Sequence, residues 1–203
     1  LEKACMGLSA VRKEYSRQLE EKVIQGLKDL NFLDVQFAIT FRQKKSFSEN
    51  GFDEVEYEIS TNPGESLKPL GKIVSGGELS RIMLALKTIT AKQEKIGTFI
   101  FDEIDAGISG KTAWKVSEKL GILGRTHQII CITHLPQIAA MADHHFYIEK
   151  NATDHSTATT ITELSEADSL KELARLSGAA QLTESVLANA KEMKDLAEKK
   201  KQN

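Results

Sequence analysis

The stretch "TFIFDEIDAGISGKT", residues 98–112, decides the fold of this chain. It opens with a short apolar run that is typical of a buried strand, and a second such run, "QIICIT", follows at residues 128–133. Apolar residues with helical spacing lie between the two runs. A strand, a helix and a strand over about 35 residues form a βαβ unit, whose strands are parallel. The stretch therefore predicts an α/β fold.

The composition is that of an ordinary globular chain. It has 203 residues, of which 40% are hydrophobic and 28% charged, and a net charge of -2 gives no global basic field for nucleic acid. The basic cluster at residues 198–203 is typical of a solvated helix end. No apolar run approaches the roughly 20 residues that span a bilayer. Cys5 and Cys131 are too few for a disulfide framework, which favours a reducing, cytoplasmic setting.

The regions around the βαβ unit predict helices and antiparallel hairpins. Apolar residues recur every three or four positions over residues 1–30, so a long amphipathic helix is expected, lying on the domain or forming the end of a coiled coil. Alternating patterns predict two antiparallel hairpins, and residues 61–72, rich in Pro and Gly, predict a loop. The hairpins are expected at 34–60 and 145–164, and further helices at 76–91, 166–176 and 181–200.

The stretch "SGGE" is the first candidate site and comprises Ser75, Gly76, Gly77 and Glu78. Its local pattern is a capping box, in which the Ser75 hydroxyl and the Glu78 side chain each bond the other's backbone amide. Two glycines in a first helical turn each cost about 1 kcal/mol relative to alanine, so something is expected to approach the backbone closely. Because a helix N-terminus attracts anions, an anion-binding role is a second reading of the same residues.

Asp102 and Glu103 form the second candidate site, at the carboxyl end of the first predicted strand. Ligands bind at this edge of open α/β sheets. One carboxylate could hold a hard cation such as Mg²⁺ while its neighbour polarises a water molecule. The alternative is that both are solvated or cap the following turn.

His134, which follows the second predicted strand, is the third candidate. Because the two strands are parallel, His134 should emerge at the same sheet edge as Asp102 and Glu103. An imidazole there could contact a γ-phosphate or orient a water molecule. The alternative is an ordinary polar histidine.

The ending "GKT", residues 110–112, raises the question of a phosphate-binding loop. That loop has the pattern G-x-x-x-x-G-K-[ST], and the position of its first glycine is occupied here by Asp105. Acidic side chains beside the cradle would repel the phosphates. We therefore expect residues 110–112 to begin the next helix in contact with solvent.

Four stretches together resemble one family. They are "TNPGE" (61–65), "LGKIVSGGELSRIMLALK" (70–87), "FDEIDAGISG" (101–110) and "ITHLPQIAAMADHHFYI" (132–148). In this order they are similar to the C-terminal half of an ABC-type ATPase head, as found in bacterial SMC-like DNA repair proteins, in which a coiled coil interrupts the head. The resemblance covers most of residues 62–150. It implies that residues 31–203 are the C-terminal lobe of such a P-loop ATPase head and that residues 1–30 end a coiled-coil arm.

The resemblance also implies a role for each candidate. Residues 75–78 would be the signature motif, which closes on the γ-phosphate of ATP held by the opposite head. Asp102 would be the Walker B carboxylate associated with Mg²⁺, Glu103 the catalytic base and His134 the switch histidine. Asp105 would belong to the D-loop, which crosses the interface of the head dimer.

The resemblance further implies partners for the chain. The Walker A lysine and the Q-loop glutamine have no counterpart, so the N-terminal head lobe of the same protein would supply the phosphate cradle. The chain starts at Leu1 within a helical pattern and is expected to be a piece that hydrolyses almost no ATP alone. The implied function is recombinational repair of DNA double-strand breaks at the nucleoid, with ATP driving engagement of two heads in a homodimer and the full-length protein binding DNA.

The residues leave two rival functions open. In a metal-dependent nuclease or phosphotransfer domain, Asp102, Glu103 and Asp105 would bind the metals directly, but "SGGE" and His134 would then have no role. In a non-enzymatic scaffold, the first helix would bind a partner coil.

Overall fold

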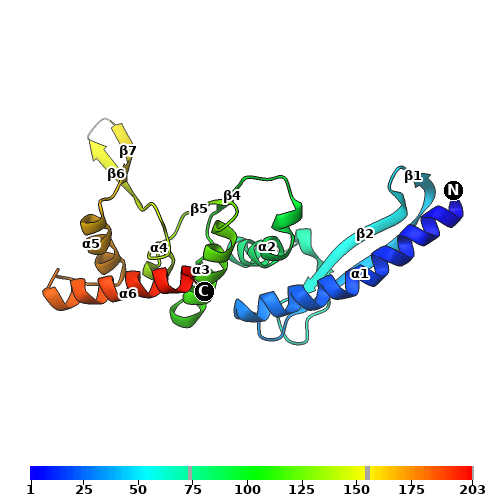
Figure 1. Cartoon of the computed structure of the whole chain (residues 1–203), viewed down its shortest axis with the longest axis horizontal. Helices are drawn as coiled ribbons and strands as arrows, with labels where there is room; N and C mark the ends of the chain where they lie inside the picture. Colours follow the sequence, from blue (N-terminus) through cyan, green and yellow to red (C-terminus); the bar gives the residue numbers. More distant parts are fainter. Residues whose placement is uncertain (73–74, 154–155, 203) are drawn as a thin grey trace.

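A computed structural model describes residues 1–72, 75–153 and 156–202 (Figure 1). In chain order the elements are helix α1 (Glu2–Asp29), strands β1 (Gln36–Ser48), β2 (Gly51–Ser60) and β3 (Lys68–Pro69), helix α2 (Gly76–Thr90), strand β4 (Thr98–Phe101), helix α3 (Gly110–Gly124), strand β5 (Gln128–Cys131), helix α4 (Pro136–Ala139), strands β6 (Phe146–Thr153) and β7 (Ser156–Glu163), and helices α5 (Glu166–Leu176) and α6 (Glu184–Gln202). The molecule is elongated. The helix α1 and the β1–β2 hairpin form one end, and α5, α6 and the β6–β7 hairpin form the other.

The predicted βαβ unit is confirmed. Strands β4 and β5 pair in parallel, with Phe101 opposite Cys131, and α3 connects them. Both predicted hairpins are also present: β1 pairs with β2, and β6 pairs with β7, antiparallel in each case. The sheet edge after Phe101 and Cys131 therefore carries the segments that hold the candidate residues.

The region predicted as a loop, residues 61–72, contains a short strand and a single 3-10 turn. Strand β3 adds to the edge of β2, with Pro69 opposite Glu58, and Leu70–Lys72 form the turn. Proline has no amide hydrogen to donate, so it is tolerated in an edge strand. Helix α6 begins at Glu184, later than residue 181, because the Thr183 hydroxyl accepts the amide hydrogen of Val186 and caps the helix.

Strand β4 was expected to be buried, and only one of its faces is. Phe99 and Phe101 belong to the core, whereas Ile100 is 68% exposed. Side chains alternate between the two faces of a strand, so the helices that cover one face leave the other open. Ile130 and Ile132, on or just beyond β5, are likewise exposed, at 46% and 49%. The β4–β5 sheet therefore has one apolar face that no described residue covers.

The main core unites α1 with the central helices and strands. Val23 and Leu27 of α1 are fully buried with Ile82 of α2. Nearer the N-terminus, the α1 side chains Leu8, Val11 and Tyr15 are exposed. The C-terminal half of α1 is thus built into the core that continues past residue 30, and the division of the chain at that residue stays a prediction.

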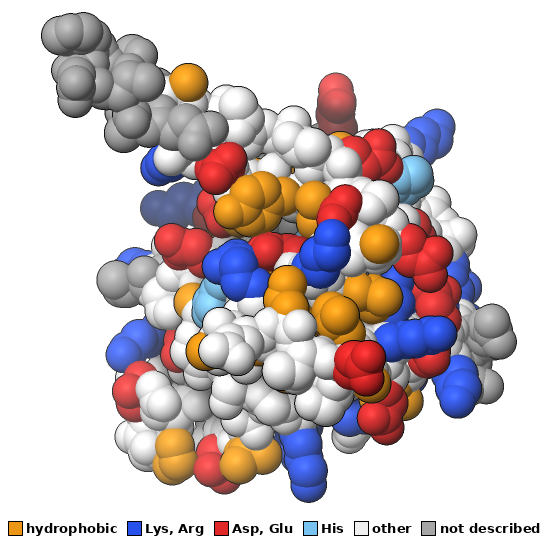
Figure 2. Space-filling view, turned by 90° about the vertical axis from the view of Figure 1, so that its left-hand side faces the viewer, with side chains coloured by type: hydrophobic (Ala, Val, Ile, Leu, Met, Phe, Trp, Pro, Cys, Tyr) orange, Lys and Arg blue, Asp and Glu red, His pale blue; other side chains and the backbone are white. Residues whose placement is uncertain are grey.

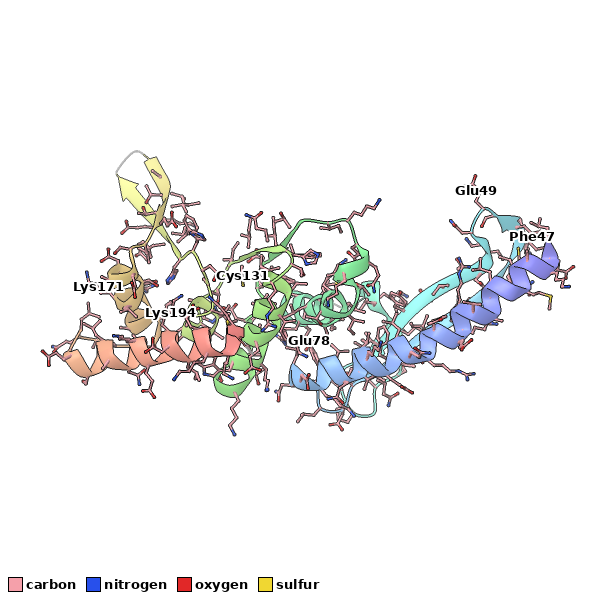
Figure 3. All side chains as sticks on the ribbon, in the orientation of Figure 1. Phe47, Glu49, Glu78, Cys131, Lys171 and Lys194 are labelled. Carbon is pink, nitrogen blue, oxygen red and sulfur yellow. The ribbon has the colours of Figure 1, made fainter. Side chains whose placement is uncertain are left out.

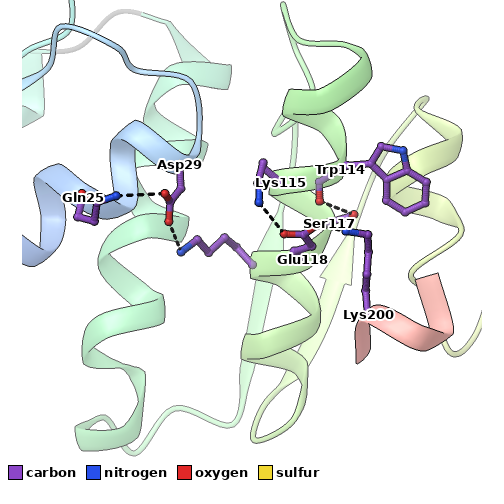
Figure 4. A network of polar contacts seen from close by, with 8 residues as sticks. Gln25, Asp29, Trp114, Lys115, Ser117, Glu118 and Lys200 are labelled. Atoms are coloured by element: carbon purple, nitrogen blue, oxygen red, sulfur yellow. Dashed lines mark hydrogen bonds and ion pairs between the residues drawn. The ribbon is translucent and has the colours of Figure 1, made fainter. Parts of the chain in front are cut away.

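A second, smaller core joins α4, α5 and α6, where Ala140, Leu173 and Ala197 are almost completely buried. Helix α3 links this core to the rest of the molecule (Figure 4). Lys119 of α3 bonds Asp29 of α1 at 2.9 Å, and Glu118 forms an ion pair with Lys200 of α6. Viewed from the α5–α6 end, acidic and basic side chains are interspersed around a hydrophobic group (Figure 2). None of the helices in the described ranges is long and apolar enough to cross a membrane.

Candidate functional site

The start of α2 has the predicted N-cap. The Ser75 hydroxyl accepts the amide hydrogen of Glu78 at 3.4 Å. Among the described contacts, the Glu78 side chain makes no return bond to the amide of Ser75, so half of the capping box is present. Ile73 and Val74, directly before the cap, lie outside the described residues. Glu78 projects from the start of α2 in the middle of the molecule (Figure 3).

The two glycines of α2 allow the loop that follows β4 to approach the helix. A Cβ on Gly76 would lie 2.5 Å from Oε2 of Glu103. A Cβ on Gly77 would lie 2.7 Å from the Cβ of Ala106 and 3.0 Å from the carbonyl oxygen of Glu103. The expectation that something approaches these glycines is thus met by the chain itself. Their binding of an anion stays a prediction.

Asp102 and Glu103 follow β4 directly, and both are exposed. The Glu103 amide donates to Oδ1 of Asp102 at 2.9 Å. Glu103 has a φ of 56°, in the left-handed region that is uncommon for residues other than glycine. Ser80 of α2 donates its hydroxyl hydrogen to the Asp102 carbonyl at 2.8 Å. A hydrogen bond therefore joins helix α2 to the acidic turn that follows β4.

His134 lies at the sheet edge after β5, where it was expected beside Asp102 and Glu103, but the carboxylate that it contacts in the structure is that of Asp105. Oδ2 of Asp105 accepts the His134 amide hydrogen at 2.8 Å and the Thr133 hydroxyl hydrogen at 2.5 Å. The Nδ1 atom of His134 lies 3.0 Å from the same oxygen. The Asp105 side chain is 4% exposed and the His134 side chain 70%. Asp105 thus faces the chain's own residues, and its contact with a partner head stays a prediction.

Arg81, a residue that sequence reasoning missed, lies behind this turn. It is 7% exposed, and its NH1 group donates to the carbonyl oxygens of Ala106 at 2.8 Å and of Ile104 at 3.4 Å. Its guanidinium carbon lies 5.5 Å from the centre of the Phe32 ring. Burial lowers the pKa of Arg81. The available signal was its position one turn before Ala85, on the apolar side of α2.

Known proteins align with almost the whole of this chain. The DNA repair protein RecN of Halalkalibacterium halodurans is 42% identical over 201 residues, which cover 97% of this chain and 36% of that protein. The chain belongs to the RecN family. RecN of Vibrio cholerae is 43% identical over 183 residues, covering 90% of this chain and 33% of that protein. The chain therefore spans about a third of the length of these RecN relatives.

The fold of this RecN-family chain is that of an SMC head. A crystal structure of the Smc head domain with a coiled coil and joint from Pyrococcus yayanosii aligns with a TM-score of 0.56. The match is 20% identical in sequence and covers 82% of this chain and 30% of that one. No protein-family model matches the chain. The structural match confirms the predicted α/β fold, which this chain shares with part of that SMC head domain.

The "GKT" ending has the structure expected of a helix start in this RecN-family chain. Helix α3 begins at Gly110, and Lys111 is exposed in its first turn. Gly110 has a φ of 52°, which glycine adopts at little steric cost. Residues 110–112 therefore form the first turn of α3, with Lys111 exposed to solvent.

Cys131, at the end of β5 in this RecN-family chain, has a thiol with a raised pKa. Burial, together with the negative charges of Asp105 and Asp102, raises its thiol pKa to about 12. The thiolate form, which reacts, is therefore suppressed. The thiol lies in the central part of the molecule (Figure 3).

The geometry does not favour the nuclease alternative. That alternative needs Asp102, Glu103 and Asp105 to converge on metal ions, whereas the Asp105 carboxylate is buried against Thr133 and His134. Within the described ranges, no group of three or more His, Cys, Asp or Glu side chains could hold a metal ion.

Proposed function

We propose that this chain is the C-terminal lobe of the ATPase head of an SMC-like protein that repairs DNA double-strand breaks by recombination. The observation that carries the proposal is the contact between Glu103 and Gly76. It unites a helix start suited to anions with an exposed carboxylate suited to activating water, in a chain related to RecN.

The side chains at this edge suit ATP and Mg²⁺. Asp102 offers an exposed carboxylate, and carboxylates are the ligands that Mg²⁺ prefers beside phosphates. Glu103 would take a proton from the attacking water, and His134 would orient the γ-phosphate. The amides of residues 75–77 would bind a phosphate that the opposite head presents. The nucleotide supplies the phosphoryl group, and these residues position it.

The uncovered face of the β4–β5 sheet supports a missing partner lobe. Ile100, Ile130 and Ile132 are strongly exposed, although isoleucine is one of the residues most often buried. We infer that the N-terminal head lobe of the same protein packs there and supplies the Walker A cradle. Two such heads would engage as a homodimer around ATP. The whole protein would act on chromosomal DNA, in the cytoplasm at the nucleoid.

The test uses the complete gene product that carries this chain. Glu103→Gln should lower the rate of ATP hydrolysis by at least about 100-fold while ATP still binds, because a general base typically contributes that much or more. Lys111→Ala is the matched control and should leave the rate within about twofold of wild type, because Lys111 projects into solvent at the start of α3. Unchanged hydrolysis by Glu103→Gln would contradict the assigned role.

A second measurement concerns residues 1–203 alone. We expect this chain to hydrolyse almost no ATP, because the signature motif meets nucleotide only across a head dimer. Hydrolysis should appear when the N-terminal lobe is added in trans. ATP turnover by residues 1–203 at the rate of the complete protein would refute the proposal that hydrolysis needs the N-terminal lobe.

A further inference from the structure

Arg81 is a buried cation whose bonds all go to backbone oxygens. Its guanidinium reaches the carbonyls of Ile104 and Ala106, and the charge of Glu78 offsets only part of the effect of burial, which lowers the pKa of Arg81. Its Nε–H group is buried without a hydrogen-bond partner among the described residues. Placing a charge in a core is expensive unless it is well bonded, so packing alone does not account for an arginine here.

The loop that Arg81 holds is held on its opposite side by Asp105. The carbonyls of Ile104 and Ala106 point to Arg81, whereas the side chain of the residue between them points to His134. Ile104 is itself fully buried. Three consecutive residues are thus fixed by α2 on one side and by the segment after β5 on the other.

The same loop determines where Glu103 lies. Its carbonyl oxygen and the Cβ of Ala106 pack against Gly77, and its carboxylate lies over Gly76. A displacement of the loop would therefore move Glu103 relative to the start of α2 and, through Asp105, move His134. Arginine suits this task because its planar guanidinium packs over the Phe32 ring and thereby holds one nitrogen, NH1, between the two carbonyl oxygens, whereas lysine presents a flexible ammonium without such a plane.

We propose that Arg81 is a positioning residue that couples the start of α2 to Glu103 and His134 through the Ile104–Ala106 loop. Arg81 is buried behind the loop, so the role proposed for it acts through the loop. The inference rests on the proposed ATPase function and deepens it, because it names the residue that keeps the three candidate sites at fixed positions relative to one another.

The test compares Arg81→Lys with the wild type in the complete gene product. Arg81→Lys keeps the charge and removes the planar guanidinium that holds NH1 between the two carbonyl oxygens. Arg125→Lys is the matched control, because Arg125 also donates to a backbone carbonyl, that of Lys201, but away from the site. We expect Arg81→Lys to lower kcat for ATP at least roughly tenfold with KM changed less than about threefold, and Arg125→Lys to change neither.

A second readout does not depend on hydrolysis. Hydrogen exchange at the His134 amide, whose acceptor is Asp105, should be at least about fivefold faster in Arg81→Lys, while exchange in the buried middle of α2 stays unchanged. Unchanged exchange at His134 would overturn the inference. Unchanged kcat in Arg81→Lys with an active wild type would also overturn it. A wild type without ATP hydrolysis would overturn the proposed function, and the exchange measurement would then decide the coupling alone.

Discussion

Asp105 accepts the amide hydrogen of His134 and thereby ties the turn after β4 to the segment after β5. The same carboxylate oxygen accepts the Thr133 hydroxyl hydrogen. Two neighbouring parallel strands are therefore joined by a buried side chain just beyond their last ladder pair, Phe101 and Cys131. The bond fixes the backbone of His134 while its imidazole stays exposed.

Asp105→Ala should lower the free energy of unfolding by about 1–3 kcal/mol, because it leaves the Thr133 hydroxyl and the His134 amide without their acceptor. Urea denaturation followed by circular dichroism measures this change. Asp34→Ala, at an exposed loop position, is the control and should stay within about 0.5 kcal/mol of wild type. Equal stabilities for the two variants would contradict the structural role of Asp105.

Gly77→Ala should be more disruptive than Gly76→Ala. The new methyl group at position 77 would overlap Ala106 and the Glu103 carbonyl, and overpacking of this kind costs about 1–3 kcal/mol. At position 76 the methyl group meets the end of the Glu103 side chain, which can rotate away. The gain in helix propensity, about 1 kcal/mol, then offsets the contact. Thermal unfolding of both variants, beside Gly7→Ala in open space on α1, would show the order.

Cys131 should resist alkylation in the folded protein. Raising a thiol pKa from 9.0 to about 12 lowers the thiolate fraction at neutral pH roughly a thousandfold. Iodoacetamide labelling followed by peptide mass spectrometry should therefore modify Cys131 only slowly. The same labelling in urea provides the control, since the unfolded chain exposes the thiol. Rapid labelling of the folded protein would show that the burial of Cys131 is wrong.

The smaller core should weaken as the pH falls. Burial lowers the pKa of His145, which bonds Ser169 at 2.8 Å and lies near Glu172 and Lys194. Between its lowered folded value and its ordinary value of 6.5, the unfolded chain binds more protons, so the free energy of unfolding rises with pH in that window. Urea midpoints from about pH 5 to pH 7 should show a shallower slope for His145→Gln. Equal slopes for the wild type and His145→Gln would contradict this role of His145.

Much of the fold was predictable because local patterns and tertiary structure agree. The period of the apolar residues located α1, α2 and α3 and both hairpins, and parallel pairing placed His134 at the sheet edge that carries the acidic turn, although its contact with Asp105 was not predicted. The exposed face of β4 was not predictable, because an apolar residue such as Ile100 has the same signature whether or not its covering layer is present. Strand β3 was missed because it has only two residues, which are too few to show an alternating pattern, and only their pairing with β2 defines them as a strand.

The candidate site was predictable in its residue types and less so in its contacts. The glycines of α2 pointed to a close approach, but only the structure shows that Glu103 and Ala106 make it. Arg81 was missed because an arginine in a helix normally projects into solvent. Its partners are backbone carbonyls, which leave no trace in the sequence.

The division into two hydrophobic cores has a consequence for thermal unfolding. Leu135 and Ile138 pack with the main core, whereas Ala139 to Met141 belong to the smaller one. The chain thus passes from the main core to the smaller one between Ile138 and Ala139, within α4. We predict that the two cores unfold as separate cooperative units, so that the smaller one melts while the βαβ unit stays folded. Heat should therefore produce two transitions, with the boundary between the part that melts first and the part that remains lying at Ile138 and Ala139.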